Sequence, residues 1–318
     1  MSSLSINPSL GNTAQPTTNS RELIEAVDSE DHKRVISLLE NGANPNTLDS
    51  KGTPVLVTAT KCAKILNTLL IFGADPNIVS KFRGAALHCS AFGVCINSAN
   101  RQITNTLLLY NANPNLPDKN GKTPVHFAAL SDDLETVQML LRSEGSLNIQ
   151  SSNGETPLLG AIMRKCQNVI TPLLESQADP NLSSTSTTTL AQAIFQDDLN
   201  LVGTLLDHNA DPNLLDKCKF SALHSAAKYG NKQIAELLLD RNADPNSTNT
   251  FGQTPLYYAA QHGWNKQKWQ ARQKVGRLLV SRGAKIDPTY HLYKSDQDSD
   301  PQHKTQSLNY LNTLQEKQ

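Results

Sequence analysis

The residues best suited to chemistry in this sequence are a cysteine beside a histidine and a second cysteine nearby. Cys89 directly follows His88, so a thiol nucleophile and a base are adjacent in the chain. Sequence neighbours seldom reach the geometry that proton transfer between them needs, and we interpret Cys89 as a small buried thiol on a helix. Cys89 and Cys95 are six positions apart with no second pair, which is not a zinc-binding spacing.

A polar stretch near the C-terminus also contains metal-ligand residue types. His291 and His303 flank the acidic residues Asp296, Asp298 and Asp300. Such a run is more typical of a solvated tail than of a metal site, and it does not continue as a calcium loop. The sequence also lacks the glycine-rich loops that hold phosphates. We therefore predict a protein that is not an enzyme and has no catalytic residues, cofactor or metal site.

Composition narrows the classes of partner. The 29 basic and 29 acidic residues leave no net charge, which argues against nucleic acid as the main partner. The sequence contains no run of 18 apolar residues, so we expect no membrane-spanning helix. The first 20 residues lack the basic and apolar regions of a secretory signal. The cysteines are odd in number and scattered over the repeats, which favours a reducing compartment, the cytoplasm or nucleus. They are Cys62, Cys89, Cys95, Cys166 and Cys218.

The stretch from Asp216 to Thr248 shows which elements must position any functional residue. It predicts a helix over Ala222–Tyr229 that ends at Gly230, and a second helix over Lys232–Leu239 whose apolar residues have helical spacing. Ala243-Asp244-Pro245-Asn246 ends the second helix, because proline lacks the N–H and restricts the residue before it. Neither helix is long enough to be stable alone, so the unit must pack against a neighbour.

Copies of this unit occur along the chain. The Ala-Asp/Asn-Pro-Asn stop recurs six times, with two weaker forms, and successive copies begin 31, 38, 33, 33, 32, 33 and 41 residues apart. A degraded Thr-Pro-Leu-His-x-Ala motif accompanies it, as in Thr123–Ala128 and Thr254–Leu256. A period near 33 with a turn and two helices is typical of ankyrin repeats. The chain resembles the ankyrin family from about Asn19 to Pro288, over eight repeats.

This resemblance implies an all-α solenoid of helix-loop-helix units with β-hairpin turns. We expect a disordered leader over 1–18, an ankyrin domain over 19–288 with insertions near 94–100 and 264–272, and a polar tail over 289–318 with a short C-terminal helix. His88, His126 and His224 occupy the histidine of the repeated motif. In the family this side chain ties one turn to the next by hydrogen bonds.

The resemblance also indicates where a partner would bind. The family uses its hairpin tips and the two variable residues after the Ala-Ala pair of the first helix. Across four consecutive repeats the first of these positions is apolar, which predicts a ladder on the order of 30 Å long: Phe92, Leu130, Met163 and Phe195. The second position adds Arg164 and Tyr229 to a polar flank, and the tips offer Phe82 and Phe251. The alternative is that the ladder residues fold down between repeats and belong to the core.

An insert in the last repeat contains both tryptophans of the chain, Trp264 and Trp269, among several basic residues. Tryptophan is enriched at binding hot spots, so the insert is a candidate second contact site. Equally, it could cover the open end of the stack with help from Leu308 and Leu311. Both interpretations stay open at the level of sequence.

We expect a non-catalytic, monomeric scaffold that holds a segment of another protein in the concave groove of repeats three to six, with no nucleic acid or membrane partner. One alternative is an effector of an intracellular bacterium, delivered into host cytosol, because the Asn/Gln/Ser-rich style resembles such proteins. Another is the targeting subunit of an enzyme complex; the flanking segments are too short to fold into a catalytic domain. A third is a substrate of an asparaginyl hydroxylase, at Asn77, Asn115, Asn148 and Asn246.

Overall fold

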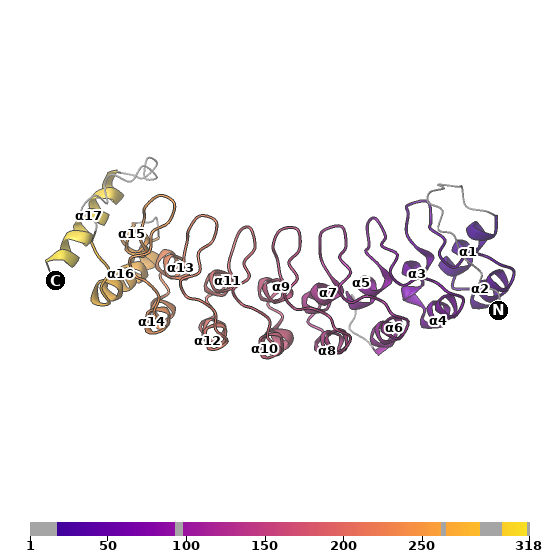
Figure 1. The fold of residues 1–318 in the computed structure, drawn as a ribbon. Coiled ribbons are helices and arrows are strands. Elements are labelled where there is room, and N and C mark those ends of the chain that lie inside the picture. The colour runs from indigo at the N-terminus through magenta and orange to yellow at the C-terminus, as the bar shows by residue number, and fades with distance from the viewer. Residues whose placement is uncertain (1–17, 93–97, 262–264, 287–300, 317–318) are drawn as a thin grey trace, which may run out of the picture. The chain divides into compact units, whose positions relative to one another are not determined.

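The structure is a computed structural model that describes residues 18–92, 98–261, 265–286 and 301–316. These residues form pairs of helices joined by long turns (Figure 1). Contacts divide the chain into two compact units, Met1–Lys119 and Asn120–Gln318, each of which is described by itself. Within the described residues, no helix is long and apolar enough to cross a membrane.

The described residues of the N-terminal unit form three helix pairs. Its apolar core lies between the helices and includes Leu23, Leu66 and Leu107, all fully buried. The helices are α1 (Thr18–Asp28), α2 (His32–Glu40), α3 (Val55–Thr58) with the 3₁₀ turn η1 (Ala59–Lys61), α4 (Ala63–Ile71), α5 (Ala86–Ala91) and α6 (Ser98–Leu109).

The described part of the C-terminal unit contains five helix pairs and a final helix. The first helices of its pairs lie in one row in Figure 1 and contact one another in chain order: α7 (Pro124–Leu130), α9 (Pro157–Arg164), α11 (Thr189–Phe195), α13 (Ala222–Tyr229) and α15 (Pro255–Ala260). The second helices pack against them: α8 (Leu134–Arg142), α10 (Gln167–Glu175), α12 (Leu199–Asp207), α14 (Lys232–Asp240) and α16 (Lys266–Ser281). The last helix is α17 (Pro301–Gln315).

The repeated Thr-Pro motif starts the first helices. Proline at the first helical position needs no hydrogen-bond partner for its nitrogen, and the preceding hydroxyl caps the helix. The Thr156 hydroxyl accepts from the Leu159 N–H at 3.2 Å, and the Ser221 hydroxyl from the His224 N–H at 3.3 Å. The turns before these helices are closed by backbone hydrogen bonds such as Ser151 N to Glu155 O at 2.9 Å. The predicted hairpins are therefore hydrogen-bonded turns, and the described residues form isolated bridges instead of regular strands.

Two buried histidines join successive turns, which confirms their predicted role. His126 Nδ1 accepts from the Thr123 N–H at 3.1 Å, which leaves Nε2 as the donor to Glu155 O at 3.0 Å. His224 repeats the pattern with the Ser221 N–H at 3.1 Å and Gln253 O at 3.0 Å. Each imidazole thus holds its own turn closed and connects it to the next repeat.

Asparagines of the stop motif form a second series of connections. In the C-terminal unit the Asn181 amide donates to Asn209 O at 2.9 Å and accepts from the Asp211 N–H at 2.7 Å. Asn148, Asn213 and Asn246 bridge their next repeats in the same way. In the N-terminal unit the Asn77 amide donates to Asn111 O at 3.1 Å and accepts from the Asn113 N–H at 2.7 Å. The candidates Asn77, Asn148 and Asn246 thus have engaged amide groups, and their hydroxylation stays a prediction.

Helix α17 covers the last repeat. Its Tyr310, Leu311 and Leu314 are buried, and the helix contacts α15 and α16 (Figure 1). The Tyr310 hydroxyl donates to Gln273 O at 2.6 Å, and its ring packs against Gly276, where a side chain would clash with it. The C-terminal segment is thus folded back onto the stack through α17.

We expect the contact between Tyr310 of α17 and helix α16 to weaken at alkaline pH. Burial raises the pKa of Tyr310 to about 12, against the opposing effect of the Arg277 charge. An exposed tyrosine ionises near pH 10, so between pH 10 and 12 deprotonation favours the detached helix and stability falls as pH rises. Between pH 9 and 11 the wild-type chain should lose about 1.4 kcal/mol more unfolding free energy than Tyr310→Phe. Urea unfolding at both pH values measures this difference, and equal losses would contradict it.

Candidate functional site

Three neighbouring first helices expose large apolar side chains near their C-terminal ends. Met163 on α9 is 48% exposed, Phe195 on α11 is 64% exposed and Tyr229 on α13 is 39% exposed. The rings of Phe195 and Tyr229 meet edge to face with centroids 5.8 Å apart. We call Met163, Phe195 and Tyr229 the apolar strip. Because α9, α11 and α13 contact one another in order, the strip crosses three successive repeats.

The other two members of the predicted ladder have different surroundings. Leu130, at the end of α7, is only partly exposed, and its Cδ2 would lie 3.2 Å from a Cβ placed on Gly160 of α9. The missing side chain at Gly160 thus lets Leu130 pack down between repeats, so for this residue the core alternative applies in part. Phe92, at the end of α5, is 38% exposed and lies in the N-terminal unit.

Positive side chains accompany the apolar strip. Arg164 and Lys165 directly follow Met163, and Lys228 directly precedes Tyr229; all three are exposed. The Lys228 ammonium lies 5.8 Å from the centroid of the Phe220 ring. No ion pair forms on Arg164, Lys165 or Lys228 within the described part of the chain.

Acidic residues of the same helix ends are already engaged. Asp132 accepts from the N–H groups of Asn168 and Val169, at 2.9 and 3.2 Å, at the start of α10. Asp133 and Asp198 cap their own following helices, and Asp197 accepts from the Asn231 amide. Glu155 pairs with Lys122 at 2.8 Å. Each of these carboxylates keeps its negative charge while it accepts these hydrogen bonds, so acidic groups lie at the same helix ends as the cations beside the strip.

Lys165 adopts an uncommon backbone conformation. Its φ of 61° and ψ of 40° are left-handed, at the position that ends the first helix of each repeat. The equivalent residues of neighbouring repeats are Asp132, Asp197 and Gly230, with φ of 56°, 57° and 82°. Glycine and Asp tolerate this region, whereas a long side chain costs roughly 1 kcal/mol there. Glu30 holds the equivalent position of the first repeat with φ of 54°, so a long side chain in this conformation is not particular to Lys165.

Comparison with known proteins decides the family. The family model described as ankyrin repeats (3 copies) matches residues 92–184 and 190–290, more than half of the chain. The chain belongs to the ankyrin repeat family. The predicted family and its all-α fold are thus confirmed.

Two further proteins are similar to this ankyrin chain. The ankyrin repeat domain of Bcl-3, a member of the IkappaB protein family, superposes with a TM-score of 0.55 at 22% identity, covering 79% of this chain and 96% of that domain; this likeness shows the fold alone. The mitochondrial disaggregase of Bos taurus is 28% identical over 128 residues, which are 40% of this chain and 19% of that protein. The matched segment thus spans about a fifth of the disaggregase.

The two phenylalanines predicted at hairpin tips of this ankyrin array are exposed. Phe251 in the C-terminal unit is 68% exposed. Phe82 in the N-terminal unit is 61% exposed, with the ammonium groups of Lys81 and Lys119 at 5.5 and 5.1 Å from its ring centroid. Both remain candidate contact residues, and their binding role stays a prediction.

The tryptophan insert lengthens α16 and ties it to the preceding repeat. Arg272 Nε donates to Lys228 O at 2.7 Å and Arg272 Nη1 donates to Gln261 O at 3.1 Å, which satisfies the ends of α13 and α15. Gly230 leaves room for Ala271, since a Cβ there would lie 2.9 Å from that methyl group. Trp269 is partly buried on α16, and Trp264 lies outside the described residues. The insert thus has a structural role, and contact by its tryptophans stays a prediction.

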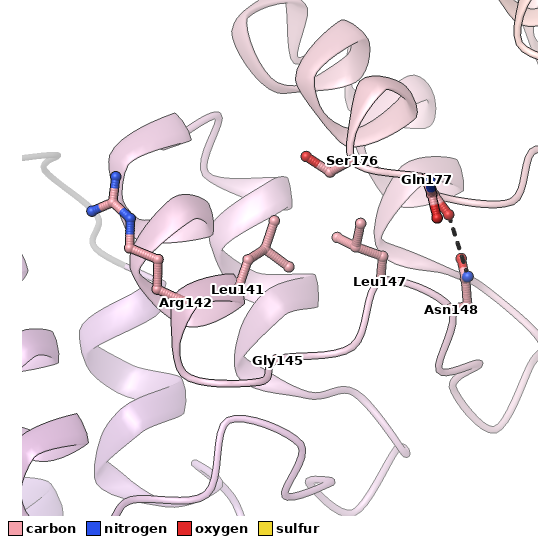
Figure 2. A pocket seen from close by; sticks show the side chains of 7 residues that line it. All are labelled: Leu141, Arg142, Gly145, Leu147, Asn148, Ser176 and Gln177. Carbon is pink, nitrogen blue, oxygen red and sulfur yellow. Dashed lines mark hydrogen bonds between the residues drawn. The ribbon is translucent and has the colours of Figure 1, made fainter.

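A shallow pocket lies at the ends of the second helices α8 and α10. Figure 2 shows its lining, in which the Asn148 amide donates to Gln177 O at 3.5 Å. Arg142 is the single charged residue among those that line it: Leu141, Arg142, Gly145, Leu147, Asn148, Ser176 and Gln177. In the described residues no three His, Cys, Asp or Glu side chains are grouped to hold a metal ion.

Sequence reasoning missed two residues of this region, Lys165 and Arg272. The signal for Lys165 was present, because Asp or Gly occupies its position in the neighbouring repeats. Arg272 had no comparable signal, since the carbonyl groups it binds lie 44 and 11 residues away in the chain.

Proposed function

We propose that this ankyrin chain is a non-catalytic protein-binding scaffold whose partner docks on the apolar strip of α9, α11 and α13. Ankyrin repeats bind other proteins as a family. The observation that carries the proposal is the exposure of Met163, Phe195 and Tyr229 on three adjoining helices. Soluble proteins seldom leave contiguous large apolar side chains in water without a binding role.

The energetics fit a partner contact. Fully burying one such side chain contributes about 1.5–3 kcal/mol, and each strip residue still has a substantial part of its surface to bury. Aromatic residues also dominate binding hot spots, and the paired Phe195 and Tyr229 rings present a rigid surface. A partner that covers the strip would therefore gain most of its affinity from few residues.

Substitution of two strip residues tests this function. Met163→Glu/Phe195→Glu should abolish capture of the partner in a pull-down from eukaryotic lysate read by mass spectrometry, because two carboxylates would have to be desolvated in the interface. Both residues are exposed, so the helical circular dichroism spectrum should not change. Leu215→Glu is the matched control, since Leu215 is 39% exposed in the same unit but lies outside the strip. An unchanged set of captured proteins would contradict the proposal.

Leu130 is a poorer choice for this test than its place in the ladder suggests. It is partly buried against Gly160, so Leu130→Glu would disturb packing as well as binding.

The predicted monomeric state and cytoplasmic location belong to the same proposal. The four cysteines of the described residues are all free thiols, which supports a reducing compartment. The effector and enzyme-targeting roles are favoured by no described residue, and we do not propose them.

A further inference from the structure

We infer that a hollow between the second helices α14 and α16 binds a phosphorylated ligand through three positive side chains that line it. The hollow has a volume of about 320 Å³, and the two helices that form it contact each other. The apolar strip lies on first helices, so this site goes beyond the proposed function. The lining consists of Lys232 of α14 and of Lys274, Arg277, Leu278 and Ser281 of α16.

The charge of the two helices is positive when their acidic residues are counted. Helix α16 contains five basic residues and no acidic one, and α14 contains one basic and two acidic residues, which gives the pair a net charge of +4. Of the two acids, Asp240 pairs with Arg282 at 2.7 Å, and Glu236 is partly exposed. Glu236 lowers the positive potential, but it is one carboxylate against three cations, and none of the five residues lining the hollow is acidic.

A neighbouring hollow brings one more carboxylate close to this site. Asp197 lines it together with Lys232 and Lys274, and accepts from the Asn231 amide while it keeps its charge. If Asp197 and its neighbour Asp198 are added to the count for α14 and α16, the net charge is still +2. The region is therefore positive although the whole chain has no net charge.

The alternative is that these cations are ordinary solvated residues of a helix face. Lys274 and Arg277 lie outside the last turn of α16, where a positive charge would favour the helix dipole. They are three positions apart on one helix, so they repel each other, and Lys232 adds a third like charge from α14. In α8, α10, α12 and α14 the same two positions hold no basic residue: Glu135, Asn168, Asn200 and Gln233 at the first, and Gln138, Thr171, Gly203 and Glu236 at the second.

Phosphate fits this lining better than other anions. A phosphate monoester carries up to two charges and several acceptor oxygens, whereas a carboxylate carries one charge. The Arg277 guanidinium matches the geometry of phosphate oxygens, and the ammonium groups of Lys232 and Lys274 add point charges. The volume of 320 Å³ is at the lower end for small-molecule sites, about 300–1,000 Å³. The ligand is thus a small phosphorylated molecule or a phosphorylated headgroup.

Calorimetric titration of the full chain with inositol hexakisphosphate tests the site. This probe carries several phosphate groups on a compact ring, and unphosphorylated inositol is the control ligand. We expect the phosphorylated probe to bind, more weakly as NaCl is raised, and inositol not to bind. A chain that binds neither compound, or both equally, would overturn the inference.

Two matched double variants separate the hollow from the general charge of α16. Lys232→Gln/Lys274→Gln removes two lining cations and should weaken binding of the probe about fivefold or more, because charge-assisted contacts are lost. Lys266→Gln/Lys268→Gln removes the same charge from exposed residues outside the lining and should change affinity less than about twofold. All four lysines are exposed, so the melting temperatures should not change. Equal losses in the two variants would overturn the site, because binding would then follow only the charge of the helix.

A second arm identifies the source of the phosphate. Phosphatidylcholine vesicles with and without phosphatidylinositol 4,5-bisphosphate are sedimented with the wild-type chain. Co-sedimentation with the phosphorylated vesicles, lost in Lys232→Gln/Lys274→Gln, would support the site with a lipid headgroup as its ligand. Binding of the free probe without co-sedimentation would support it with a soluble ligand.

The site and the apolar strip can be tested independently. Met163→Glu/Phe195→Glu should bind inositol hexakisphosphate within about twofold of wild type, because its substitutions lie on α9 and α11 and not on the helices of the hollow. Loss of probe binding in this variant would overturn the placement of the ligand in the hollow. Loss of partner capture with unchanged probe binding would support both the proposed function and this site.

Discussion

His224→Ala is expected to lower the free energy of unfolding by about 3 kcal/mol. The His224 imidazole is fully buried, and its loss removes the acceptor of the Ser221 N–H and the donor to Gln253 O. Each buried group left without a partner costs about 1–3 kcal/mol, and the cavity beside the Phe220 ring, at 4.9 Å from the imidazole, adds to this. Urea unfolding followed by circular dichroism measures the loss.

A control and a pH dependence sharpen this prediction. His208 is partly exposed and bonds to Thr204 O of its own helix, so His208→Ala should cost about 0.5 kcal/mol or less. Burial lowers the pKa of His224, so the unfolded chain takes up the proton first and stability falls as pH drops below about 6.5. Wild type should therefore lose more stability than His224→Ala between pH 7.5 and 5.5. Similar costs for the two alanine variants would show that the imidazole does not connect the repeats.

Leu311→Asp is expected to detach α17 from the last repeat, at a cost of about 3 kcal/mol. Leu311 is 5% exposed and lies on the face of α17 that also buries Tyr310 and Leu314. A carboxylate there must either lose its hydration or leave the packed position, and leaving is the cheaper outcome for a terminal helix. Hydrogen exchange of the α17 amides should accelerate strongly, while exchange in α9 and α11 should not change, because each repeat contacts only its neighbours.

Asn312→Asp provides the matched control for this prediction. It introduces the same carboxylate one residue later, on the exposed face of α17, and should leave exchange of the helix almost unchanged. If Asn312→Asp accelerated exchange as much as Leu311→Asp, added negative charge and not lost burial would be the cause, and the packing role of α17 would be wrong.

The repeat units followed from the sequence because their determinants are local. The helices predicted over Ala222–Tyr229 and Lys232–Leu239 correspond to α13 and α14, with α14 one residue longer. Gly230, the hydroxyl cap of Ser221 and the stop at Pro245 act within a few residues of themselves. The turn-to-turn role of the histidines was also predictable, but only through the resemblance to the ankyrin family, in which the histidine of this motif ties one turn to the next.

Exposure and charge pairing were decided only by the tertiary structure. Leu130 and Met163 occupy equivalent positions in the sequence pattern, yet Leu130 sinks toward Gly160 while Met163 is 48% exposed, because the neighbouring repeat lacks a side chain at that point. Asp132 accepts a hydrogen bond from the N–H of Asn168, 36 residues away at the start of α10. Lys165 and Lys228, by contrast, form no ion pair within the described ranges. A repeat pattern fixes which residues share a face, but the neighbouring repeat determines which of them remain free to bind.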